Sequence, residues 1–135
     1  MLNLKEQLQS TFRLNSFRDG QREAIQDLLS GKDVVAVMPT GGGKSLLYQL
    51  PASIQESGVS IVISPLIALM KDQVESLNRI GVPALFCNSS QDELEQLTAI
   101  SRAVTGKIKL LYISPERALS SYFTTMLKKM KVNFF

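Results

Sequence analysis

The sequence predicts an α/β fold in which a mainly parallel β-sheet carries helices on both faces. Short apolar runs alternate along the chain with longer stretches of helical periodicity. Three consecutive glycines stand between the first apolar run and the helix-like segment that follows it. The 135 residues are 44% hydrophobic and 20% charged, which suits one soluble domain with its own core.

Five strands are expected, because β-branched and aromatic residues crowd into five short runs bounded by turn residues. These runs are 33–38, 59–63, 83–87, 109–113 and 132–135.

Six helices are expected from apolar periodicity, two before the first strand and four between the strands. Gly31 and Gly81 are expected to end the helices that precede them. The expected helices cover about 2–12, 20–30, 44–55, 66–80, 92–104 and 116–130.

The composition excludes several kinds of chemistry. The chain has no histidine and one cysteine, Cys87, so it cannot form a Ser-His-Asp or Cys-His relay or a zinc site of the usual kind.

The opening residues do not form a targeting sequence, and no apolar run reaches about 18 residues. We therefore expect a cytoplasmic protein without a membrane segment. We also expect a monomer.

The charges are unevenly distributed along the chain. The net charge of +3 is too small to mark a nucleic-acid binder by itself. The stretch 107–135, however, contains six basic residues and one acidic residue, which gives it +5 and leaves −2 for the rest. The C-terminal fifth of the chain is therefore basic.

The pattern Ile-Ser-Pro-x-x-Ala-Leu occurs twice, at 63–69 and 113–119, each time after an expected strand and before an expected helix. Serine suits a helix N-cap and proline suits the first helical turn, so the repeat has a purely local explanation. Alternatively, Ser64 and Ser114 with the N–H groups of the two helix starts could hold the phosphates of a nucleic acid.

The strongest signal is the segment Met38-Pro39-Thr40-Gly41-Gly42-Gly43-Lys44-Ser45, between an expected strand and an expected helix. The three glycines allow a nest of backbone N–H groups around a phosphate. Lys44 could reach the β- and γ-phosphates of a nucleotide, and Ser45 could ligate Mg²⁺. Met38 stands where the strict phosphate-loop pattern has glycine, so this loop is a variant. A glycine-rich turn of purely structural purpose is the alternative.

Residues 38–51, MPTGGGKSLLYQLP, resemble the Walker A segment of RecQ-type DNA helicases, which belong to helicase superfamily two. Four other segments resemble motifs of the same family and follow its order. FRDGQREAI at 17–25 is similar to the adenine-recognition motif, and SPLIALMKDQV at 64–74 is similar to motif Ia. CNSSQ at 87–91 is similar to the family's N-S-[ST]-Q corner, and YISPER at 112–117 is similar to the motif Ib region.

The resemblance implies a RecA-like P-loop lobe that uses ATP and Mg²⁺. The chain would be a partial N-terminal ATP-binding domain over 1–135, with leading helices at 1–31 that carry the adenine motif. Lys44 and Ser45 would be the catalytic residues, and Ser45 the metal ligand. The nucleotide-binding residues would be Arg18, Gln21, Thr40, Gly41, Gly42, Gly43, Lys44 and Ser45, with Gln21 on the adenine and Arg18 near the base or sugar.

The resemblance also implies DNA as partner, bound as a single strand or at a junction of duplex and single strand, and unwinding in the 3′-5′ direction. Ser64, Lys71, Ser114 and Arg117 would contact the phosphates of the DNA strand. For Lys71 and Arg117, a solvated charge on a helix is the alternative interpretation.

The chain shows no Asp-Glu box after an apolar strand, which a P-loop motor needs for Mg²⁺ and for the attacking water. The one Asp-Glu pair, Asp92-Glu93, is expected to be structural, because Ser90-x-x-Glu93 fits a capping box. We therefore expect a sheet that is incomplete at its C-terminus. The chain alone should bind ATP without efficient hydrolysis and without unwinding.

Two other functions fit parts of the sequence. A stand-alone ATP- or DNA-binding module without catalysis agrees with the missing carboxylates. A small P-loop phosphotransferase shares the loop and the alternating fold, but we find no lid with arginines that would clamp the phosphates.

Overall fold

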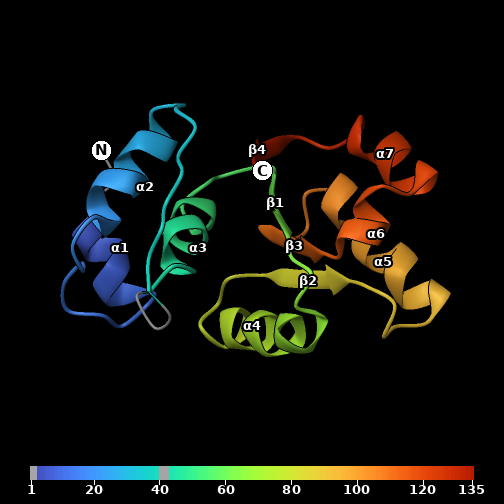
Figure 1. The fold of residues 1–135 in the computed structure, drawn as a ribbon, viewed down its shortest axis with the longest axis horizontal. Helices are drawn as coiled ribbons and strands as arrows, with labels where there is room; N and C mark the ends of the chain where they lie inside the picture. Colours follow the sequence, from blue (N-terminus) through green and yellow to red (C-terminus); the bar gives the residue numbers. More distant parts are fainter. Residues whose placement is uncertain (1–2, 40–42) are drawn as a thin grey trace. The chain divides into compact units, whose positions relative to one another are not determined.

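The computed structural model describes residues 3–39 and 43–135. These residues fall into two compact units, one reaching to Ile54 and the other running from Gln55 to Phe135. The first unit contains helices, and the second contains a parallel sheet with helices packed against it (Figure 1). The predicted α/β class is confirmed.

The first unit packs three helices, α1 (Leu4–Ser10), α2 (Gln21–Leu29) and α3 (Leu46–Ser53). Asn3 caps α1, since its side chain accepts hydrogen bonds from the N–H groups of Lys5 and Glu6. The apolar stripes of the three helices meet in one core, which explains why short helices are stable here. The core is formed by Leu4, Leu8, Ile25, Leu46, Leu47 and Leu50.

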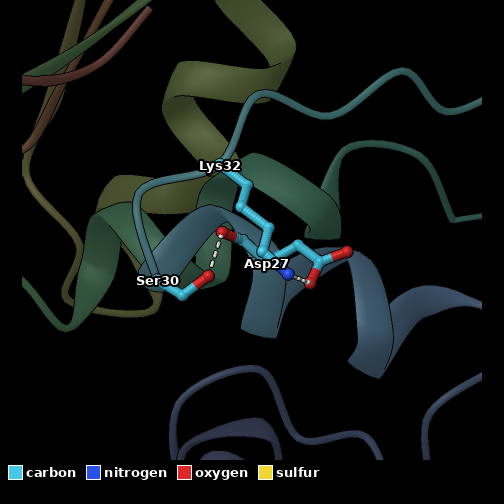
Figure 2. A network of polar contacts seen from close by, with 3 residues as sticks. All are labelled: Asp27, Ser30 and Lys32. Carbon is cyan, nitrogen blue, oxygen red and sulfur yellow. Dashed lines mark hydrogen bonds and ion pairs between the residues drawn. The ribbon is translucent and has the colours of Figure 1, made fainter.

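Helix α2 ends in a small polar network (Figure 2). The hydroxyl of Ser30 donates to the carbonyl oxygen of Asp27 at 2.8 Å, and Lys32 Nζ lies 3.5 Å from Asp27 Oδ1. Gly31 follows with φ +90°, a left-handed conformation that glycine adopts without strain. The expected stop at Gly31 is confirmed, and the chain turns there into the segment that leads to the glycine loop.

The expected strand at 33–38 is wrong, because these residues are assigned to neither a strand nor a helix. Val35 and Val37 are each 94% exposed, while Met38 packs against the core of the first unit. A strand is stabilised by a ladder of hydrogen bonds to a neighbouring strand. The described elements of this unit are all helices, so none of them offers such a ladder.

The second unit contains a four-stranded parallel sheet of order β2-β3-β1-β4. Four of the five expected strands are therefore confirmed. The register aligns Ile63 with Ile113, and Ile113 with Cys87, so three strands end at the same edge. The strands are β1 (Val59–Ile63), β2 (Ala84–Cys87), β3 (Leu110–Ile113) and β4 (Val132–Phe134).

Helices cover both faces of this sheet. Buried residues of α5 (Glu93–Val104) and α7 (Ser121–Leu127) pack on the face that carries Val59, Ile61 and Leu111. Helix α4 (Ile67–Arg79) buries Met70, Val74 and Leu77 and packs along β2. It lies apart from α5 and α7, across the strands (Figure 1). Gly81, with φ +85°, ends α4 as expected.

The expected helix at 116–130 is two helices, α6 (Pro115–Ala118) and α7. Ser120 separates them, because its hydroxyl accepts the N–H of Phe123 at 3.2 Å and caps α7. Apolar periodicity continues through this break, so the pattern alone did not reveal it.

The expected capping box at Ser90 and Glu93 is also wrong, since the box before α5 is formed two residues later. The Asp92 carboxylate accepts the N–H of Glu95 at 2.8 Å, and Glu95 Oε1 accepts the N–H of Asp92 at 3.2 Å. The hydroxyl of Ser90 instead donates to Asn88 Oδ1. The first carboxylate of the Asp-Glu pair thus caps a helix.

None of the described helices is long and apolar enough to cross a membrane.

Candidate functional site

The end of the glycine loop leads directly into α3. Thr40, Gly41 and Gly42 lie outside the described residues. Lys44 is exposed, and Ser45 is half-buried at the N-cap of α3, where its carbonyl oxygen accepts the N–H of Gln49 at 2.9 Å. The helix therefore begins at Leu46, two residues after the expected start. The hydroxyl of Ser45 makes no capping hydrogen bond, so the helix start does not use it.

The side chain of Gln21 connects the predicted adenine motif to this loop. Gln21 is the first residue of α2 and is 3% exposed. Its Oε1 accepts the N–H of Arg18 at 2.7 Å, and its Nε2 donates to the carbonyl oxygen of Gly43 at 3.1 Å. A side-chain amide has two N–H donors and two acceptor lone pairs, so each end keeps capacity for one more hydrogen bond.

Gly43 meets two requirements that only glycine satisfies. Its φ of +79° is left-handed, and a Cβ added there would overlap Nε2 of Gln21. The Cδ atom of Arg18 lies 3.8 Å from the same Cβ position. The structure therefore brings Arg18, Gln21 and Gly43 together within the first unit.

A cavity of about 310 Å³ opens beside the same corner. Arg18 lines it, whereas Gln21 is not among its lining residues. Its size is at the lower end of the range for small-molecule sites. It is formed by Lys5, Ser16, Phe17, Arg18, Asp19, Gly20, Arg22 and Glu23.

A second cavity, of about 650 Å³, was not expected from the sequence. It lies between the start of α1, one side of α2 and the end of α3, and none of the predicted site residues lines it. No local motif marks it, because its lining comes from residues far apart in the chain. They are Asn3, Leu4, Arg22, Gln26, Leu29, Ser30 and Ile54.

In the second unit, the two Ile-Ser-Pro corners lie at the ends of neighbouring strands. The N–H of Ser64 donates to the carbonyl oxygen of Ile113 at 3.1 Å, and the N–H of Ser114 donates to that of Cys87 at 3.2 Å. Ser114 occupies the N-cap position of α6, but its side chain makes no capping hydrogen bond. Ser64 is not an N-cap: its hydroxyl accepts the N–H of Leu66, and α4 starts only at Ile67.

The exposure of the four predicted DNA contacts differs. Lys71 on α4 and Arg117 on α6 are exposed, and Ser64 is half-buried. Ser114 is 1% exposed, so its hydroxyl does not face solvent in this structure. Burial raises the pKa of the Cys87 thiol, and the positive charge of the nearby Arg117 lowers that pKa to a smaller extent.

The corner at 87–91 has an internal structural role. Gln91 Nε2 donates to the carbonyl oxygen of Phe86 at 2.9 Å, and Gln91 Oε1 accepts the N–H of Asn88 at 3.1 Å. Asn88 is buried, and its Nδ2 contacts Met70 Sδ of α4 at 3.3 Å. These bonds fix the end of β2 against α4.

Comparison with known proteins gives consistent matches. Residues 18–134 match the family model described as DEAD/DEAH box helicase. The "ATP-dependent DNA helicase RecQ" of Haemophilus influenzae is 46% identical over 127 residues, covering 94% of this chain and 20% of that protein. The RecQ helicase of Bacillus subtilis is 45% identical over 122 residues, covering 90% of this chain and 20% of that protein. The "ATP-dependent DNA helicase Q1" of Mus musculus is 42% identical over 129 residues, covering 93% and 20%. The chain thus spans about a fifth of the length of these relatives.

Proposed function

This chain belongs to the DEAD/DEAH box helicases and is of RecQ type, and from this we propose that it supplies the ATP-binding part of an ATP-dependent DNA helicase. The relatives are named as ATP-dependent DNA helicases, so ATP is the expected nucleotide and DNA the expected substrate of the whole protein. Unwinding in the 3′-5′ direction, a monomeric state and a cytoplasmic location belong to the same proposal.

The observation that supports this proposal best is the hydrogen bond from Gln21 to the carbonyl oxygen of Gly43. It joins the residue proposed to read adenine with the loop proposed to hold the phosphates. Because Gln21 is buried and bonded at both ends, its amide is held in one orientation before a base arrives. Its remaining donor and acceptor capacity suits the adjacent N6 donor and ring acceptor of adenine. Arg18 would lie beside the base or sugar.

The phosphates would bind at the start of α3. The N-terminus of a helix attracts anions, and the exposed Lys44 adds a full positive charge there. Thr40, Gly41, Gly42 and Gly43 would supply the backbone around the phosphates. The hydroxyl of Ser45 is not used in capping, so its chemistry fits a Mg²⁺ ion that is otherwise held by phosphate and water oxygens. When bound, Mg²⁺ would neutralise charge on the β- and γ-phosphates.

In the second unit, Ser64, Lys71 and Arg117 would hold DNA phosphates beside the ends of β1 and β3, with Ser114 at the same corner. The backbone N–H groups of Ser64 and Ser114 are already paired in the sheet. Contacts to phosphate would therefore come from the Ser64 hydroxyl and from the two cations.

We expect little hydrolysis by the chain itself. Asp92-Glu93 is its one Asp-Glu pair, and the carboxylate of Asp92 caps α5. This protein should therefore bind nucleotide with little hydrolysis of it.

Calorimetric titration with Mg-ATP tests these roles. Lys44→Ala should weaken binding at least about ten-fold, since a charge-assisted contact to phosphate is lost. Lys32→Ala, which removes an exposed lysine of the same unit, should leave binding unchanged. Equal affinities of Lys44→Ala and the parent chain would refute the assignment of the phosphate loop.

Phosphate release, measured with and without single-stranded DNA, tests the expected lack of turnover. Turnover that DNA stimulates and Lys44→Ala abolishes would show that these 135 residues do supply a catalytic carboxylate. Asp92→Asn and Glu93→Gln would then be the first variants to examine.

A further inference from the structure

The segments that precede the four strands contain five lysines and lie at one edge of the sheet. All the strands are parallel, so residues 55–58, 80–83, 105–109 and 128–131 lie at the same edge, which we call the amino edge. These segments contain one acidic residue, Glu56. They contain five basic residues, Lys107, Lys109, Lys128, Lys129 and Lys131.

Backbone hydrogen bonds fix the spacing of this edge. The N–H of Lys109 donates to the carbonyl oxygen of Pro83, and the N–H of Ser60 donates to that of Lys109, each at 2.8 Å. On the other side, the N–H of Val59 donates to the carbonyl oxygen of Lys131 at 2.8 Å. Lys109 and Lys131 thus flank the start of β1, about 10 Å apart at the usual strand spacing.

The loop before β1 is also held firmly against the loop before β4. Lys131 Nζ donates to the hydroxyl of Ser57 at 2.5 Å, and Asn133 Nδ2 donates to the carbonyl oxygen of Ser57 at 2.7 Å. A Cβ on Gly58 would come within 2.7 Å of the carbonyl oxygen of Lys131, so only glycine allows this approach. The lysines therefore project from a defined backbone.

Four of the five lysines carry charges that no described carboxylate compensates. Lys107, Lys128, Lys129 and Lys131 are exposed, and among residues 3–39 and 43–135 the structure shows no ion pair for any of these four. The opposite edge of the same sheet differs in sign. Its helix starts carry Asp92, Glu93, Glu95 and Glu116 against the two cations Lys71 and Arg117.

We propose that the amino edge is a second binding surface for the phosphate backbone of nucleic acid. A lysine cluster of this kind could also attract an acidic protein, but protein interfaces are enriched in aromatic residues and depleted in lysine. The exposed large apolar residues of the second unit are Ile63, Leu66, Leu69, Leu94, Leu119, Tyr122 and Phe135. None of them belongs to the four segments of the amino edge, so charge and not apolar contact would dominate binding there.

This surface shares no residue with the proposed nucleotide loop, and it lies at the edge of the sheet opposite the proposed contacts at the carboxyl ends of the strands. It also accounts for five of the six basic residues in the C-terminal fifth of the chain; the sixth, Arg117, belongs to the proposed contacts at the carboxyl ends. Binding would be insensitive to sequence and sensitive to salt, because phosphate contacts release counterions.

Three double variants that each remove two positive charges test the proposal. Lys107→Gln with Lys129→Gln changes the amino edge, Lys71→Gln with Arg117→Gln changes the opposite edge, and Arg13→Gln with Lys32→Gln is the control in the first unit. The probe is a fluorescently labelled single-stranded DNA of mixed sequence, followed by anisotropy over a series of salt concentrations. Equal thermal midpoints would show that all three variants remain folded.

The salt slope is the decrease in the logarithm of the binding constant per unit increase in the logarithm of the salt concentration. A lysine that contacts one phosphate of single-stranded DNA contributes about 0.7 to this slope, which corresponds to about five-fold in affinity at 0.1 M salt. The amino-edge variant should therefore bind about 25-fold more weakly, with a slope smaller by about 1.4, while the control keeps the parent values. An amino-edge variant that matches the control would overturn the proposal. So would competition by polyglutamate as effective as competition by unlabelled DNA of equal charge, which would indicate an acidic protein as the partner.

Discussion

Gly43→Ala probes the contact that links the adenine motif to the glycine loop. Gly43 has a φ of +79°, and an alanine in the left-handed region costs about 1–2 kcal/mol. The added Cβ would also overlap Nε2 of Gln21. Because Gln21 is buried, its amide can move aside only by giving up the hydrogen bond to Gly43, which is worth about 1 kcal/mol. Gly43→Ala should therefore lower the free energy of unfolding by about 2–3 kcal/mol.

A double-mutant cycle separates the two contributions. Gln21→Ala alone should cost about 1–3 kcal/mol, because the N–H of Arg18 and the carbonyl oxygen of Gly43 lose their side-chain partner. When both substitutions are combined, the overlap is absent and the hydrogen bond is lost only once. The double variant should therefore be about 1 kcal/mol more stable than the sum of the single effects predicts. Urea unfolding followed by far-ultraviolet circular dichroism measures all three free energies.

Gly31→Ala is the matched control for this cycle. Gly31 has a φ of +90° in the same unit, and a Cβ there would meet no atom within 4 Å. Gly31→Ala should therefore lower the free energy of unfolding only by the cost of the left-handed backbone. Its effect should simply add to that of Gln21→Ala. If Gly43→Ala and Gln21→Ala add to within about 0.5 kcal/mol, as independent sites do, the inferred contact is refuted.

Two further predictions concern the second unit. Burial raises the pKa of the Cys87 thiol, so the folded chain should react with a disulfide reagent only as fast as it opens; rapid reaction at neutral pH would contradict this. Since the unfolded thiol ionises first, the free energy of unfolding should fall as the pH rises above the pKa of the unfolded thiol. Cys87→Ala should not show this fall in parallel urea titrations. Asp92→Ala should cost about 1 kcal/mol through loss of the cap of α5, whereas the neighbouring Glu93→Ala should cost only a few tenths; equal urea midpoints for the two variants would contradict the assigned cap.

The sequence predicted correctly the strands that find a neighbouring strand in the sheet and the helix ends that a glycine marks. β1, β2 and β3 were predictable because their apolar runs are bounded by turn residues, and Gly31 and Gly81 mark helix ends by their conformation. The segment at 33–38 has the same β-branched composition, yet it forms no strand. Strand propensity describes how a residue fits a ladder, but it does not supply the neighbour that completes one.

The sequence indicates the residue types of the candidate site but not the contacts that join them. The glycines, Lys44 and Ser45 form a recognisable pattern because phosphate binding requires those residues close together in the chain. The hydrogen bond from Gln21 to Gly43 joins residues 22 positions apart, and nothing in the local sequence indicates it. The capping box is a different case, because Asp92-x-x-Glu95 has the same spacing as Ser90-x-x-Glu93, so spacing alone does not tell which pair forms the box.

The two edges of the sheet differ in charge, so DNA binding at each of them would have a different physical basis. At the carboxyl ends of the strands, four carboxylates outnumber Lys71 and Arg117, so long-range attraction for a polyanion is weak there. A DNA strand at this edge would depend on short-range contacts with Ser64 and with these two side chains. At the amino edge, exposed lysines stand on a backbone fixed by hydrogen bonds, so attraction acts over about a Debye length, without close fit. Capture by the amino edge and positioning by the carboxyl edge would therefore respond differently to salt, which is how the two contributions can be told apart in one titration.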